Sequence, residues 1–261
     1  MQERVMFGPH NMTKAEAVAI VCNILIEELM IRATRLNEVR NYYDIGIVRY
    51  SGEGVEDVLP MSQNGLTPIV TLAKLRPEPQ PIYIDQFDDK GYCKTVKFLL
   101  PQWVTPLAIG TTPLHEALCH IYSIANSWCT KPENRDSFPP IIINITDGEG
   151  SDGRTYDYLK IADNIKALKT DDGNVLFINI HLSKGTECSS IIYPSNDGFR
   201  SDDKSQQLLF EMSSVLPFCF EPLVYELTEH RYAGPYRGVA FNANVTELLS
   251  IISIGTESHK F

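Results

Sequence analysis

The sequence predicts an α/β fold, in which a doubly wound, mostly parallel sheet carries helices on both faces. Segments with a helical period alternate along the chain with short runs rich in β-branched residues. One of these runs, residues 140–145 (PIIINI), is almost entirely apolar, as in a strand buried on both faces. The 261 residues can bury a sizeable core, and we expect a single domain over residues 1–261.

The first predicted element is a helix over residues 13–35. Thr13 and Glu16 have the spacing of a capping box at its start. Its apolar residues surround it almost completely, which predicts burial on more than one side. No strand is expected before it, and a strand over residues 44–50 (DIGIVRY) should follow it.

Residues 60–108 differ in composition, since they hold seven of the 16 prolines. Two strand-like runs, residues 82–87 (IYIDQF) and 92–99 (YCKTVKFL), flank a four-residue turn sequence. The segment is too short for a core of its own. We therefore expect a β-hairpin insertion within the domain.

A helix over residues 114–128 has the clearest amphipathic stripe, with apolar residues at offsets 0, 3, 4, 7, 10, 11 and 14. Thr112 is expected to cap it, with Pro113 at its first position. The remaining expected elements are strand 140–145, helix 154–169, strand 175–181, helix 203–216, strand 238–241 and helix 245–253. The last two belong to a C-terminal segment, residues 217–261. Its helix should begin with a capping pair, Asn244 and Glu247, and stop at Gly255.

Charge and composition exclude several functions. The chain has 23 Lys and Arg against 33 Asp and Glu, a formal net charge of −10. A nucleic-acid or anionic-membrane binder normally presents a basic face, so we expect neither partner. No apolar run reaches the roughly 18 residues of a membrane span, and we identify no secretory signal at the start of the sequence. We therefore expect a cytoplasmic protein.

The six cysteines are scattered and include no CxxC pair, which argues against a zinc site or a disulfide framework. Cys22 and Cys119 lie inside apolar helical patterns. Buried free thiols in a reducing compartment are therefore expected.

Two segments carry the candidate chemistry: residues 110–118 (GTTPLHEAL), a loop that turns into a helix, and residues 143–148 (INITDG), a strand that ends in an acid. Ligands of open α/β sheets collect at the carboxyl ends of the strands. Asp147 is at such an end, and Thr112 offers a hydroxyl at a helix start. Oxygen ligands of this kind suit Mg²⁺ or Ca²⁺. Taken singly, Thr112 reads as a helix cap and Asp147 as a turn residue.

In this order and spacing, the two segments resemble the von Willebrand factor A domain. That family holds a metal ion with an Asp-x-Ser-x-Ser loop after its first strand, a Thr in a Gly-Thr-Pro-Leu-like turn, and an Asp in a Thr-Asp-Gly turn. Thr112 and Asp147 match the second and third parts. The resemblance to bacterial members extends to residues 44–50, 102–106 (QWVTP), 175–181 (VLFINIH) and 238–243 (GVAFNA), and so covers most of the chain.

The first part of the motif is absent, because no Asp-x-Ser-x-Ser occurs near residue 1. In many family members a Met follows this motif directly, and we interpret Met1 as that methionine. The family's central first strand and the rest of its metal-ion-dependent adhesion site would then lie upstream, lost through a mis-assigned start or a shortened chain. The alternative is a degenerate domain that never had the site.

The resemblance implies a protein-interaction module and not an enzyme. Its metal, Mg²⁺ (or Mn²⁺ or Ca²⁺), would be held by Thr112 and Asp147, only weakly in the truncated chain, and would bind an Asp or Glu of a partner protein. Bacterial relatives work beside stress-response proteins, phosphatase and kinase pairs, or AAA+ ATPases. Two other classes stay open: a metal-dependent hydrolase or phosphotransferase, with Glu149, Asp152 or His181 as its base, and a metal-free scaffold.

Overall fold

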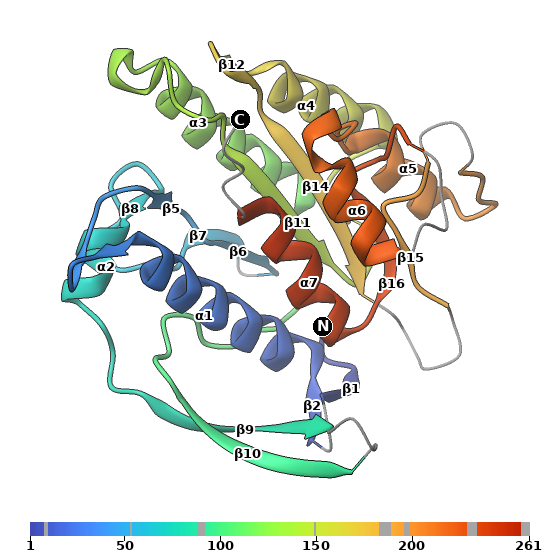
Figure 1. Ribbon diagram of the computed structural model, residues 1–261. Coiled ribbons are helices and arrows are strands. Elements are labelled where there is room, and N and C mark those ends of the chain that lie inside the picture. Colours follow the sequence, from blue (N-terminus) through green and yellow to red (C-terminus); the bar gives the residue numbers. More distant parts are fainter. Residues whose placement is uncertain are drawn as a thin grey trace. The chain divides into compact units, whose positions relative to one another are not determined.

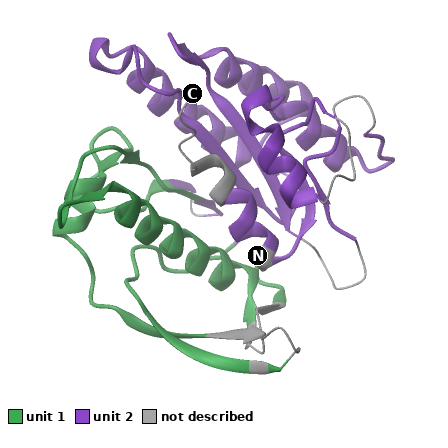
Figure 2. Ribbon diagram, viewed as in Figure 1, with its two compact units in different colours: residues 1–49, 56–109 green, residues 50–55, 110–261 purple. Residues whose placement is uncertain are grey.

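The computed structural model describes residues 1–7, 10–52, 54–87, 92–148, 150–182, 189–195, 199–228 and 234–256 (Figure 1). The chain divides into two compact units (Figure 2). Unit 1 comprises Met1–Arg49 and Glu56–Ile109, and unit 2 comprises Tyr50–Val55 and Gly110–Phe261. The hairpin of β6 (Val48–Ser51) and β7 (Gly54–Asp57) contributes residues to both. A single domain over residues 1–261 stays a prediction.

Unit 1 combines two helices with small antiparallel pairs of strands. The helices are α1 (Lys14–Ala33) and α2 (Ile69–Lys74), and the pairs are β1 (Arg4–Phe7) with β2 (His10–Thr13), β3 (Thr34–Arg35) with β4 (Glu38–Val39), β5 (Asp44–Ile45) with β8 (Thr67–Pro68), and β9 (Gln80–Phe87) with β10 (Cys93–Leu100). The predicted helix and the predicted hairpin within residues 60–108 are confirmed. The turn of that hairpin, residues 88–91, lies outside the described residues.

The start of α1 follows the predicted capping box. The Glu16 N–H donates to Thr13 Oγ1 over 3.2 Å, and the Thr13 N–H donates to Glu16 Oε2 over 2.6 Å. The buried amide of Asn23 satisfies the backbone of a second segment: Oδ1 accepts from the N–H groups of Trp103 and Val104, and Nδ2 donates to the Val104 carbonyl. This pairing fixes residues 103–104 against α1, within the core that α1 and α2 share.

Two expectations for unit 1 are wrong. A hairpin, β1 with β2, precedes α1 where no strand was expected, because four-residue strands are too short to show a clear alternation. The segment expected as one strand over residues 44–50 divides into β5 and β6, which pair with different partners. Gly46 lies between them, where a Cβ would come within 2.6 Å of the Gly65 carbonyl oxygen, so a close backbone approach interrupts the strand.

Unit 2 is built on a four-stranded sheet in the order β11 (Ile141–Thr146), β14 (Leu176–Leu182), β16 (Val239–Ala243) and β15 (Ile191–Ile192). The first three strands are parallel, and β15 is antiparallel to β16. The helices are α3 (Leu114–Cys129), α4 (Thr155–Ala167), α5 (Lys204–Met212), α6 (Glu221–Thr228) and α7 (Val245–Thr256), and a small hairpin joins β12 (Lys169–Thr170) to β13 (Gly173–Asn174). In Figure 1, α4 and α5 lie behind the sheet and α7 lies in front of it.

The fold is therefore mixed α/β with a mostly parallel sheet, as predicted, while the doubly wound arrangement stays a prediction. The Asn244–Glu247 capping pair of α7 is confirmed. Three details were wrong. Helix α7 continues through Gly255, because a glycine inside a helix costs only about 1 kcal/mol. Helix α6 was missed in a weakly patterned segment. Cys119 is a free thiol, as expected, but it is exposed and not buried. The buried residues of α3 lie on the other side of the helix from Cys119.

Burial differs sharply between the two central strands. All residues of β14 are buried except His181, whereas the isoleucines of β11 are only half-buried. Among the described residues, β11 pairs with β14 alone and so forms an edge of the sheet. The expectation that residues 140–145 are buried on both faces is wrong for this strand. Its apolar sequence is that of an inner strand, but its position is that of an edge.

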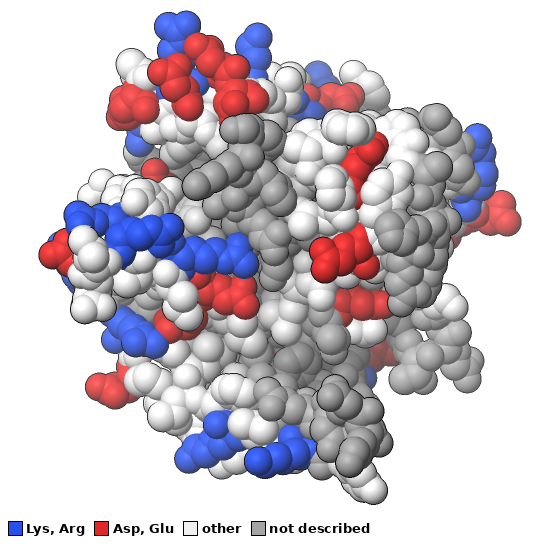
Figure 3. Space-filling view, viewed as in Figure 1, with Lys and Arg blue, Asp and Glu red and all other residues white. Residues whose placement is uncertain are grey.

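On the face shown in Figure 3, described Lys and Arg side chains lie interspersed with Asp and Glu. Among the described residues, none of the helices combines the length and the apolar character that crossing a bilayer requires.

Candidate functional site

The carboxyl end of β11 presents Asp147 in a tight turn. Thr146 is buried, and its hydroxyl donates to the Gly148 carbonyl over 2.9 Å and accepts from the Gly148 N–H over 3.2 Å. Thr146 is paired in register with His181 of β14, so Asp147 follows directly at the carboxyl edge of the parallel strands. Asp147 itself is half-buried. This is the position at which ligands of open α/β sheets collect.

The loop that carries Thr112 is joined to the loop that follows Asp147. The Thr112 N–H donates to Ser151 Oγ over 3.0 Å, and the Thr112 carbonyl accepts from the Ser151 N–H and hydroxyl over 2.9 and 3.0 Å. Three hydrogen bonds between two residues make this a firm connection. The structure thus brings the loops of both predicted site residues together by their backbones, with Thr112 half-buried.

Helix α3 begins differently from the prediction. Its N-cap is Pro113, which offers no side-chain hydrogen bond, and Thr112 does not cap it. The cap comes instead from Asp152, whose two carboxylate oxygens accept from the N–H groups of His115 and Glu116, each over 2.9 Å. The Tyr158 hydroxyl donates to the same carboxylate. The sequence offered Thr112 as a local cap, so it gave no signal for this remote partner.

The capping role sets the charge state of Asp152. Burial by itself would raise the pKa of its carboxyl group, but the hydrogen bonds from the backbone N–H groups of His115 and Glu116 and from the Tyr158 hydroxyl lower the pKa below its usual value. The carboxylate is therefore ionised at neutral pH. Its negative charge also interacts favourably with the dipole of α3 at the N-terminus of that helix.

Replacing Asp152 by Asn is expected to lower the free energy of unfolding by about 0.3–1 kcal/mol at pH 7, because Asn keeps one acceptor oxygen for α3 but loses the charge and the second acceptor. The folded pKa is depressed, so the stabilisation is present above the unfolded value of about 3.9 and is lost as the pH falls through the folded pKa. Urea unfolding between pH 3 and 7 measures this, and the difference from the parent chain should shrink at acid pH. Asp136→Asn, at an exposed aspartate, is the control; a deficit at Asp152 that does not depend on pH would contradict the assignment.

Gly52, which follows β6, lies against the start of the Thr112 loop. A Cβ on Gly52 would lie 2.8 Å from Gly110 Cα and 2.9 Å from the Thr111 nitrogen, both of them backbone atoms. Gly110 itself has a φ of +68°, which favours glycine. Two glycines therefore allow two backbones to approach at the entrance to the Thr112 loop.

The Gly52→Ala substitution is expected to destabilise the chain by about 1–3 kcal/mol, because the added methyl group displaces the backbone at residues 110–111. Thermal melting measures the loss. Gly148→Ala is the matched control, since no atom lies within 4 Å of the Cβ it would add. If both substitutions lower the melting temperature by the same small amount, the backbone at residues 110–111 accommodates the added methyl group without destabilising the chain.

A series of hydrogen-bonded polar side chains, buried at Asn144, Asn179 and Ser213, crosses the sheet beneath this site. The Tyr50 hydroxyl donates to Asn144 Oδ1 over 2.7 Å, Asn144 Nδ2 donates to Asn179 Oδ1 over 2.9 Å, and Asn179 Nδ2 donates to Ser213 Oγ over 2.9 Å. The Ser213 hydroxyl then donates to the Leu209 carbonyl. The two asparagines are opposite each other in the parallel register of β11 and β14. Each of these side chains has its hydrogen-bond partners, so the series fixes that register and holds Tyr50 beside β11.

The remaining predicted residues divide as follows. Asp152 serves α3, His181 lies half-buried near the carboxyl end of β14, and Glu149 lies outside the described residues. Among the described residues, no group of three or more His, Cys, Asp or Glu side chains is placed to hold a metal ion. A site made of one aspartate and hydroxyl groups is not such a group, so the metal role of Thr112 and Asp147 stays a prediction.

Comparison of the chain with protein-family models, with curated protein sequences and with solved structures finds no match.

Proposed function

We propose that this chain is a von Willebrand A-type interaction module, which binds an acidic residue of a partner protein through a divalent metal ion. The observation that carries the proposal is the joining of two loops in unit 2. The Thr112 loop is bound to Ser151, in the loop that Asp147 opens at the carboxyl edge of β11. The two motif segments, more than 30 residues apart in sequence, thereby become neighbours at the carboxyl edge of the strands, the edge at which ligands of open α/β sheets collect in general.

The donor set fits a hard cation. Asp147 would supply a carboxylate oxygen and Thr112 a hydroxyl oxygen, the ligands that Mg²⁺ and Mn²⁺ prefer. The metal's charge would offset the desolvation of a partner's Asp or Glu at an open coordination position, so the affinity of the pair would depend on the cation. The two residues supply too few ligands for a tight site by themselves.

The edge position of β11 supports the view that a strand belongs beside it. Its half-buried isoleucines and its unpaired side, among the described residues, would suit an apolar neighbour. We propose that this neighbour is the strand that carries Asp-x-Ser-x-Ser in the family.

The cytoplasm remains the proposed compartment.

A hydrolase or phosphotransferase is less well supported. Asp152, one of its possible bases, has a lowered pKa and accepts three hydrogen bonds as the cap of α3, so it is poorly suited to take up a proton. Metal binding distinguishes the two remaining proposals, because the interaction module requires a bound cation and a metal-free scaffold does not.

The test uses Mn²⁺ as a paramagnetic probe of the chain in solution. Millimolar Mn²⁺ is expected to broaden the amide resonances of residues 111–112 and 147–148 first, and Asp147→Ala should abolish this selectivity. Asp136→Ala, which removes an exposed carboxylate elsewhere in unit 2, should leave it intact. Uniform broadening, or broadening that survives Asp147→Ala, would favour the scaffold.

A further inference from the structure

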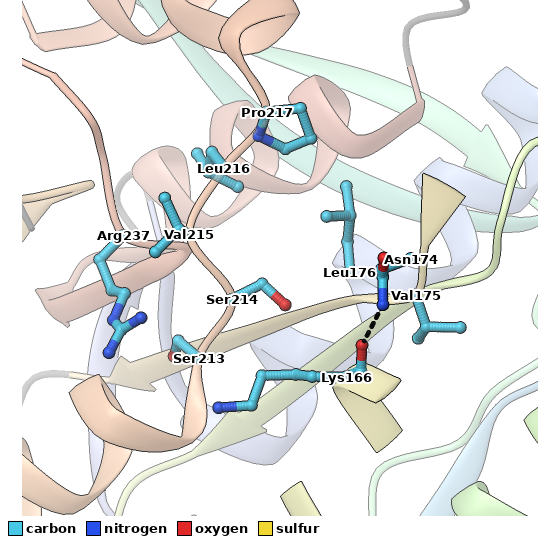
Figure 4. Close-up of a pocket in the computed structure, with 10 residues that line it drawn as sticks. All are labelled: Lys166, Asn174, Val175, Leu176, Ser213, Ser214, Val215, Leu216, Pro217 and Arg237. Atoms are coloured by element: carbon cyan, nitrogen blue, oxygen red, sulfur yellow. Dashed lines mark hydrogen bonds between the residues drawn. The ribbon is translucent and has the colours of Figure 1, made fainter. Parts of the chain in front are cut away.

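A second concave site lies in unit 2, at the opposite end of the sheet from Asp147. It is a pocket of about 470 Å³ lined by Lys166, Asn174, Val175, Leu176, Ser213, Ser214, Val215, Leu216, Pro217 and Arg237 (Figure 4). It adjoins Leu176, the first residue of β14, whereas Asp147 follows the strand end paired with His181. At about 3.3 Å per residue, the two sites are separated by the length of the strand.

Arg237 is the residue of this pocket whose hydrogen-bond donors are left for a ligand. It is half-buried, its Nε is buried without a hydrogen-bond partner, and its guanidinium forms no ion pair with any described residue. The guanidinium carbon lies 4.8 Å from the centroid of the Phe210 ring, a cation–π contact that holds the group in place without neutralising it. Burial lowers the pKa of Arg237, although the charges of Glu211 and Asp163 oppose this shift.

Lys166 supplies a second cation to the lining of the pocket. Its ammonium donates to the Glu211 carbonyl over 3.0 Å and pairs with Asp163 over 3.0 Å, so two of its three N–H donors are used and one is left for a ligand. In Figure 4 the Lys166 ammonium and the Arg237 guanidinium lie on either side of Ser213. The lining also includes apolar side chains, those of Val175, Leu176, Val215, Leu216 and Pro217.

We propose that this pocket binds a small organic anion, with its carboxylate or phosphate group on Arg237 and Lys166 and its apolar part against Leu176, Leu216 and Pro217. A guanidinium with unused donors binds planar or tetrahedral oxyanions through paired hydrogen bonds. The volume is within the range of small-molecule sites, about 300–1,000 Å³. This proposal is independent of the metal site, since none of its residues belongs to the Thr112 or Asp147 loops.

Titration calorimetry with three six-carbon probes tests the proposal on the full chain. Hexanoate and hexyl phosphate are the anionic probes, and hexanol is their neutral counterpart. Both anions are expected to bind with one-to-one stoichiometry and at least tenfold more tightly than hexanol. The tighter of the two identifies the natural anionic group as carboxylate or phosphate.

Variants locate the binding. Arg237→Gln should weaken both anions at least tenfold, Arg237→Lys should weaken them less, and Arg135→Gln should change nothing, because Arg135 is exposed and paired with Asp171. Equal affinity of hexanol and hexanoate for the parent chain, no anion binding at millimolar concentration, or unchanged affinity in Arg237→Gln would each overturn the proposal. The first two readouts need no variant, so they decide the matter even if Arg237→Gln fails to fold.

Discussion

Replacing Asn179 by Asp is expected to destabilise the chain by about 3–5 kcal/mol at pH 7, the largest effect of any single substitution considered for this protein. Asn179 is fully buried in β14, and its two amide atoms bond to Asn144 and Ser213. An aspartate of the same shape would place an uncompensated charge in the sheet, and it would lose the donor that faces Ser213. Both neighbours are themselves buried, Asn144 in β11 and Ser213 directly after α5.

The sign of the pH dependence distinguishes this cause from simple misfit. Burial should raise the pKa of the new carboxyl group above the unfolded value of about 3.9. The deficit relative to the parent chain is therefore smallest near or below pH 4, where the group is protonated in both states, and grows as the pH rises through the folded pKa. Urea unfolding between pH 4 and 7 measures it. Gln207→Glu makes the same change of amide to acid on the exposed surface of α5 and should cost little; a deficit at residue 179 that is constant with pH would indicate lost shape instead of buried charge.

A version of the chain that carries an upstream apolar strand ending in Asp-x-Ser-x-Ser is expected to gain stability from Mg²⁺. A ligand that binds only the folded state raises stability by RT ln(1 + [L]/Kd), about 2.7 kcal/mol at a hundredfold excess over Kd. The 261-residue chain should gain little, since it supplies one motif carboxylate and one motif hydroxyl and water would fill most of the six positions around Mg²⁺. Thermal melting with and without millimolar Mg²⁺ measures both.

The Asp147→Ala substitution in the extended chain should abolish this gain, because it removes a motif carboxylate at the strand end. Asp136→Ala should leave the gain unchanged. If the extended chain melts at the same temperature with and without Mg²⁺ or Mn²⁺, or if the gain survives Asp147→Ala, these residues do not form the proposed site.

The sequence by itself determined the elements whose signals are local. The capping box of Thr13 and Glu16, the stripe of α3 and the apolar run of β11 each depend on residues within a few positions, and each element formed where it was expected. The residues of the β9–β10 hairpin and the Asn244–Glu247 cap of α7 are local in the same sense. Likewise, Thr112 and Asp147 could be singled out because each stands at an element boundary.

Only the tertiary structure decided which distant residues meet. Three contacts depend on loop closure and strand register, which no local pattern encodes. They are the capping of α3 by Asp152, the bonds between Ser151 and Thr112, and the pairing of Asn144 with Asn179. The same holds for burial: β11 has the sequence of an inner strand and half-buried isoleucines, because burial depends on the neighbours that a strand acquires. Arg237 has an ordinary sequence context, and it becomes a candidate anion ligand only because the fold places it over Phe210, in the same pocket as Lys166 and without an ion pair to any described residue.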